Sequence, residues 1–101
     1  MEANIKEFYD HVQQQLGIEG LEFTPTQVEK LDETTIIVTG TCPDYGDAED
    51  EVCVEWCPTG CFKWVDMDGN TPLGPSVEEA YDTMVNYIGR LAKTKRAVSW
   101  F

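Results

Sequence analysis

The segment 51–64, EVCVEWCPTGCFKW, constrains the fold more than any other part of this sequence. Apolar and polar side chains alternate on both sides of the tripeptide PTG, and this period of two predicts two β-strands joined by a three-residue hairpin loop. If Cys57 is paired with Cys61, the register follows, and Glu55 lies opposite Lys63 as a cross-strand ion pair. One face of this hairpin then carries only large apolar side chains, namely Val52, Val54, Trp56, Phe62 and Trp64.

The residues before this hairpin predict a helix and an earlier hairpin. A helix is expected over 4–16 because its apolar residues recur at helical spacing, with Asn4 and Glu7 as its capping box and Gly17 as its end. Two runs rich in β-branched residues, QVEKL and TIIVTGTC, flank the turn DETT and predict a pair of strands.

The residues after the hairpin predict a turn and a second helix. Asp68-Gly69 is expected to form a type I′ turn between FKWVDM and NTPL. Ser76 and Glu79 make an S-x-x-E capping box, and an apolar stripe at helical spacing follows it. Residues 93–101 are expected to form either a last short strand or a mobile tail of basic and aromatic residues.

These elements predict one α+β domain over residues 1–101, in the order α-β-β-β-β-α. An antiparallel sheet of about four strands, in two hairpins, is expected to carry the C-terminal helix on one face. No run of 18 apolar residues and no signal-peptide pattern is present, so we expect a soluble, cytoplasmic protein that does not contact membranes. Its four cysteines are then expected to be reduced.

The net charge of −12 limits the kinds of partner. All nineteen acidic residues and three of the seven basic ones lie in residues 1–89, which carry a charge of −16, whereas residues 90–101 carry +4. Such a body repels nucleic acid and anionic membranes, and it attracts basic protein surfaces. The alternative is that the charge serves solubility alone.

The densest acidic cluster lies between residues 44 and 55, where no basic residue occurs. Carboxylates at this density can steer towards and block a cationic cleft, so this cluster is the candidate partner-binding site. The alternative is a solvated acidic loop. The cluster comprises Asp44, Asp47, Glu49, Asp50, Glu51 and Glu55.

The cysteines have two structural interpretations. On strands, Cys57 and Cys61 are about 4.5–5.5 Å apart, close enough for a disulfide, but Cys53 is about 13 Å from Cys57, too far for both to bind one zinc ion. If residues 47–57 are instead a helix, Cys53 and Cys57 are neighbours, and Cys42 and Cys61 can complete a four-thiolate metal site. The alternation of Val52, Val54 and Trp56 favours the strand, and cysteines that only pack are a third possibility.

Two short resemblances involve the same segment. CVEWCPTG is similar to the end of the cluster-binding motif of bacterial-type ferredoxins, which implies an iron–sulfur cluster, although Asp47 and Asp50 stand where that motif has its other two cysteines. EWCPTGCFK is similar to the W-C-x-x-C turn of thioredoxin-like oxidoreductases, which implies thiol–disulfide exchange, with three residues rather than two between the cysteines.

The element order resembles the double-stranded-RNA-binding domain, but the acidic run SVEEA stands where that family has its basic cluster, which argues against direct nucleic-acid binding. The single histidine, His11, has no nucleophile beside it in the sequence, so no enzyme activity is expected.

In size and acidity the chain is similar to phage-encoded inhibitors of host defence such as anti-CRISPR proteins. The sequence therefore predicts a small, non-enzymatic binding or inhibitor protein without a cofactor. Its partner is expected to be a basic protein surface, such as that of a nucleic-acid-binding protein, which it engages as a nucleic-acid mimic. The alternative is a zinc or iron–sulfur protein that uses Cys42, Cys53, Cys57 and Cys61.

Overall fold

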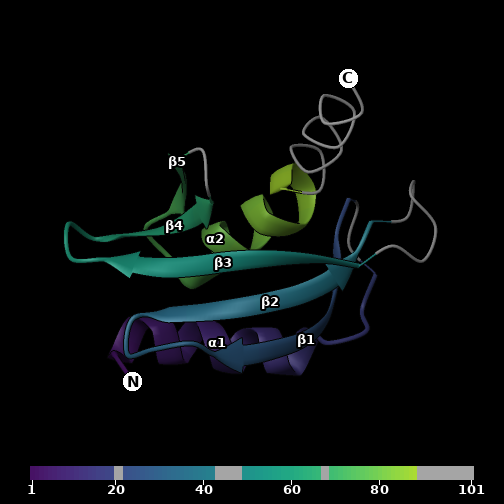
Figure 1. The fold of residues 1–101 in the computed structure, drawn as a ribbon, viewed down its shortest axis with the longest axis horizontal. Coiled ribbons are helices and arrows are strands. Elements are labelled where there is room, and N and C mark those ends of the chain that lie inside the picture. The colour runs from purple at the N-terminus through teal and green to yellow at the C-terminus, as the bar shows by residue number, and fades with distance from the viewer. Residues whose placement is uncertain (20–21, 43–48, 67–68, 89–101) are drawn as a thin grey trace.

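The fold is built on a single antiparallel sheet in which sequential strands lie side by side (Figure 1). The computed structural model describes residues 1–19, 22–42, 49–66 and 69–88. The sheet has five strands in the order β1-β2-β3-β4-β5, so every connection within it is between neighbouring strands. The strands are β1 (Thr24–Lys30), β2 (Thr35–Thr41), β3 (Glu49–Cys57), β4 (Cys61–Asp66) and β5 (Gly69–Gly74).

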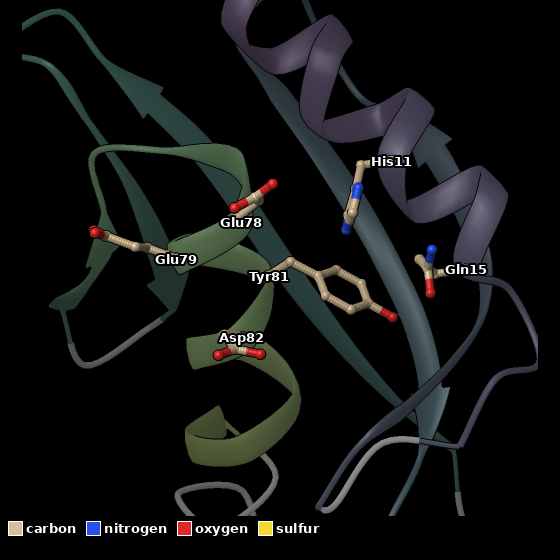
Figure 2. A pocket seen from close by; sticks show the side chains of 6 residues that line it. All are labelled: His11, Gln15, Glu78, Glu79, Tyr81 and Asp82. Atoms are coloured by element: carbon tan, nitrogen blue, oxygen red, sulfur yellow. The ribbon is translucent and has the colours of Figure 1, made fainter.

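The helices lie together on one side of this sheet (Figures 1 and 2). They are α1 (Ala3–Gln15) and α2 (Val77–Thr83), and α2 continues into a π-helical turn over Met84–Ile88. Residues of both helices and of all five strands form one buried cluster, in which the rings of Phe8 and Phe62 lie 5.0 Å apart. The structure is therefore a two-layer domain with its core between the helices and one sheet face. Its α+β class and the C-terminal helix on one sheet face are as the sequence predicts.

The central hairpin has the predicted register. Cys57 pairs with Cys61, Trp56 with Phe62, and Val54 with Trp64. Residues 49–57 are therefore a strand, and the helical alternative for this segment is wrong. The turn closes through a hydrogen bond from the Gly60 amide to the Cys57 carbonyl, 2.9 Å long. Gly60 has φ of 106°, a left-handed conformation that favours glycine over a residue with a side chain.

The sequence predicts about four strands, and the structure has five. The segment after the expected Asp68-Gly69 turn, NTPL, is part of β5, which pairs with β4. Asp68 itself and residues 93–101 lie outside the described residues, so the turn type and the proposed tail stay predictions. In the part of the chain that is described, no helix is long and apolar enough to cross a membrane.

The first helix begins differently from the prediction. Its N-cap is Glu2, not Asn4, and the Glu2 carboxylate accepts hydrogen bonds from the backbone amides of Asn4 and Ile5 at 3.0 and 3.2 Å. These bonds lower the pKa of Glu2 below its ordinary value, with the Asn4 amide as the largest cause. Helical structure ends at Gln15, and the expected stop, Gly17, has φ of 81°.

The second helix begins as predicted. Ser76 is the N-cap, and its hydroxyl accepts a hydrogen bond from the amide of Glu79 at 3.2 Å. From the predicted apolar stripe, Ala80, Met84 and Val85 are buried in the core. The sequence signals for this helix therefore describe both its start and the face that it buries.

Candidate functional site

The face of the sheet that points away from α1 and α2 is the main candidate site, and we call it the open face. None of the described elements packs on it. Because side chains alternate along a strand and register partners share a face, the register defines which residues lie there. The open face includes Gln27, Glu29, Thr35, Ile37, Thr39, Thr41, Glu49, Glu51, Cys53, Glu55, Cys57, Cys61, Lys63 and Val65.

The centre of the open face is a short apolar row across three strands. Ile37 of β2 pairs with Cys53 of β3, which pairs with Val65 of β4. All three side chains are partly exposed. Beside this row on β1 lies a charged residue, the exposed Glu29, which is the register partner of Ile37. An apolar centre with charged residues beside it has the composition of a small protein-binding surface.

Carboxylates surround this row. Glu49 and Glu51 are successive residues on this face of β3 and are exposed, and Glu55 follows them after Cys53. Successive residues on one face of a strand are about 6.6 Å apart. The strand places these three predicted residues on one surface, and the register adds Glu29 from β1, which the sequence pattern did not indicate.

The other predicted acidic residues are placed differently. Asp50 lies on the opposite side of β3 from Glu49 and Glu51, is partly buried, and accepts a hydrogen bond from the Cys42 thiol at 3.3 Å. Asp44 and Asp47 lie outside the described residues. The acidic cluster of the sequence is therefore divided, and three of its six members share the open face.

One basic side chain, Lys63, lies among the described residues of the open face. It is the register partner of Glu55, as predicted, but the expected ion pair is not formed, because their charged atoms do not come within 4.0 Å. Lys63 interacts instead with the thiol of Cys57. The ion pairs that do form between described side chains, Lys6–Asp10 and Lys30–Glu33, lie elsewhere.

The four cysteines do not converge. Cys42 is fully buried and hydrogen-bonded to Asp50, whereas Cys53, Cys57 and Cys61 are partly exposed on the open face. Cys53 and Cys57 are four residues apart on one strand, about 13 Å at ~3.3 Å per residue. No three metal-ligating side chains come together within the described ranges. The four-thiolate arrangement of the alternative hypothesis therefore has no counterpart in this geometry.

Two thiols of the open face, Cys57 and Cys53, differ in acidity. The pKa of Cys57 is lowered, first by a hydrogen bond from the Thr59 hydroxyl at 3.2 Å, then by the Thr59 amide and by Lys63. The pKa of Cys53 is raised by burial and, to a smaller degree, by the negative charges of Glu55 and Asp32. Cys57 therefore forms a thiolate more readily than Cys53 does.

A second candidate is a shallow groove between the two helices, with a volume of about 520 Å³ (Figure 2). The rings of His11 and Tyr81 meet edge to face in it, with centroids 4.7 Å apart. Burial raises the pKa of Tyr81. In Figure 2 the side chain of Glu79 points away from His11 and Tyr81, so the acids do not converge on one point. The lining residues are His11, Gln15, Glu78, Glu79, Tyr81 and Asp82.

In this groove His11 packs against Tyr81. A scan against protein-family models gave no match, and searches of curated proteins and of solved structures gave none either. The function is therefore inferred from the site alone.

Proposed function

We propose that this protein is a small acidic binding protein whose open face docks on a basic protein surface. The observation that carries the proposal is the register, which gathers Glu29, Glu49, Glu51 and Glu55 on the sheet face opposite the helices. Three of these carboxylates are exposed, and Lys63 is the single cation among them within the described residues. A rigid sheet holds the charges at fixed spacing, which favours complementarity with a cationic surface.

The partner that this chemistry fits is the positively charged surface of a nucleic-acid-binding protein. Glu49 and Glu51, about 6.6 Å apart along β3, and Glu55, about 13 Å beyond Glu51, can occupy positions where such a protein otherwise holds phosphates. The partly exposed row Ile37, Cys53 and Val65 would supply the apolar contact at the centre of the interface. Inhibition by occupation of a nucleic-acid groove, as in anti-CRISPR-like phage proteins, is the form of this function that the acidity of the whole chain supports.

The test compares two charge-matched variants of the full chain. The open-face variant is Glu49→Gln, Glu51→Gln and Glu55→Gln. The control removes three exposed carboxylates from the helical layer, Glu7→Gln, Asp10→Asn and Asp82→Asn. Binding is measured by fluorescence anisotropy against a panel of purified basic nucleic-acid-binding domains, in low and moderate salt and with duplex DNA as competitor.

We expect the open-face variant to bind about tenfold more weakly or worse, since electrostatic steering alone changes association rates by about 10–10³. The control is expected to lose about twofold or less. Equal losses in both variants would show that only net charge matters. Binding to no member of the panel at low salt would overturn the assignment of a basic partner.

A further inference from the structure

The tip of the β3–β4 hairpin brings two thiols together. Cys57 and Cys61 are register partners on either side of the turn Pro58-Thr59-Gly60, and both are free thiols. Cα atoms of directly opposed residues in an antiparallel pair are about 4.5–5.5 Å apart, which lies within the ~4.4–6.8 Å that disulfides span. The turn therefore holds these two cysteines where a bond between them requires little backbone movement.

The surroundings of the pair distinguish its two members. The Thr59 hydroxyl donates a hydrogen bond to the Cys57 sulfur, and the side chain of Lys63, two residues after Cys61, also interacts with that sulfur. Both groups favour the thiolate of Cys57 over its thiol, and this is the form that attacks disulfides. Cys61 lies directly opposite, in the position of a resolving thiol.

We propose that Cys57 and Cys61 form a redox-active dithiol that exchanges with small-molecule disulfides such as oxidised glutathione. The Cys57 thiolate attacks one sulfur of the disulfide, a mixed disulfide forms at Cys57, and one thiolate of the small molecule leaves. The Cys61 thiol then loses its proton to solvent and attacks the Cys57 sulfur, which expels the second thiolate. The protein dithiol is oxidised by two electrons, and one disulfide is reduced to two thiols.

The other two cysteines are not placed to take part. Cys53 lies on the same face but about 13 Å along β3 from Cys57, and its pKa is raised by burial. Cys42 is fully buried, and its thiol donates a hydrogen bond to Asp50, which lies on the sheet face opposite the open face. The site is thus a two-thiol unit, and it does not depend on the carboxylates assigned to partner binding.

The experiment follows the full chain through mixtures of reduced and oxidised glutathione. Samples are quenched with acid, their remaining thiols are alkylated, and intact and peptide masses are recorded. The variants are Cys57→Ser, Cys61→Ser and, as the matched control, Cys53→Ser, with circular dichroism to compare their folds. As the oxidised fraction rises, the wild type and Cys53→Ser are expected to lose two hydrogens and show a Cys57–Cys61 linked peptide.

The two remaining variants test which cysteine attacks the small-molecule disulfide and which one resolves the mixed disulfide. Cys61→Ser is expected to accumulate a glutathione adduct on Cys57, because the resolving thiol is absent. Cys57→Ser is expected to form no internal disulfide. A wild type that collects only glutathione adducts, or an internal disulfide that persists in Cys57→Ser or disappears in Cys53→Ser, would overturn the proposal.

A kinetic measurement tests the role of the turn residue independently of any disulfide. Thr59→Val removes the hydroxyl that bonds to the Cys57 sulfur. Alkylation of Cys57 by iodoacetamide at neutral pH is expected to slow a few-fold, while Cys53 is unaffected. An unchanged rate at Cys57 would contradict its assignment as the activated nucleophile.

Discussion

The two faces of the sheet are made by the same strands but have opposite properties. On the covered face, Val52 and Val54 of β3 are at most 2 % exposed, and the side chains of α1 and α2 fill the space above them. On the open face, Cys53 and Glu55 of the same strand are partly exposed. The covered face holds the buried core of the domain, whereas the open face carries the groups to which we assign partner binding and thiol exchange. Substitutions on the two faces should therefore have separable effects on stability and on function.

The largest effect is expected in the core. Phe8→Ala removes a fully buried ring that packs against Phe62, and the cavity left behind should lower the free energy of unfolding by about 3–5 kcal/mol. Urea denaturation followed by circular dichroism measures this loss. A cost below about 1 kcal/mol would mean that the helical layer is not held to the sheet as the structure shows.

A smaller loss of stability is expected from a substitution at Gly40 of β2. Gly40 and its neighbour Thr39 lie on opposite faces of the sheet, so the pair compares the two faces. A Cβ atom at Gly40 would lie 2.5 Å from the backbone oxygen of Thr24 and 2.5 Å from the ring of Phe23. Gly40→Ala should therefore cost about 1–3 kcal/mol, because the β1–β2 pair must move apart. Thr39→Ala, on the open face, is the matched control and should change stability by about 0.5 kcal/mol or less. Equal costs at both positions would contradict the assignment of the faces.

The smallest effect on stability is expected from the carboxylates of the open face. Glu51→Gln removes one of several like charges along β3, so the thermal midpoint should change by less than about 3 °C, with a rise at low salt that fades as salt is added. Differential scanning fluorimetry over a salt series measures this thermal midpoint. A large loss of stability would mean that Glu51 has a structural role rather than a recognition role.

Local sequence patterns predicted much of the fold. The alternation around Pro58-Thr59-Gly60 predicted the register of β3 and β4, and the Ser76 capping box predicted the start of α2. The N-cap of α1 was predicted wrongly. Glutamate is not among the favoured capping residues, but the Glu2 carboxylate reaches the amides of Asn4 and Ile5 and so takes the place of a shorter capping side chain.

The candidate site was predicted less completely. Glu49, Asp50 and Glu51 form one cluster in the sequence because they are adjacent, yet strand alternation places Asp50 on the other side from its neighbours. That alternation is a local property, so the division of the cluster follows from the strand pattern alone. The contribution of Glu29 needs, besides the predicted β1–β2 hairpin, the pairing of β2 with β3, which no local pattern contains.

The sequence by itself predicted both helices, most of the strands and the apolar side of the central hairpin, because these follow from side-chain periodicity over a few residues. It left a helix as the alternative for residues 47–57. Only the tertiary structure decided that both helices pack on the same sheet face and leave the other open, because helix placement depends on packing between distant segments. The same holds for the side chain of Lys63. The sequence placed it opposite Glu55, whereas in the structure it also lies near the Cys57 sulfur, where it adds to the lowering of the Cys57 pKa by Thr59.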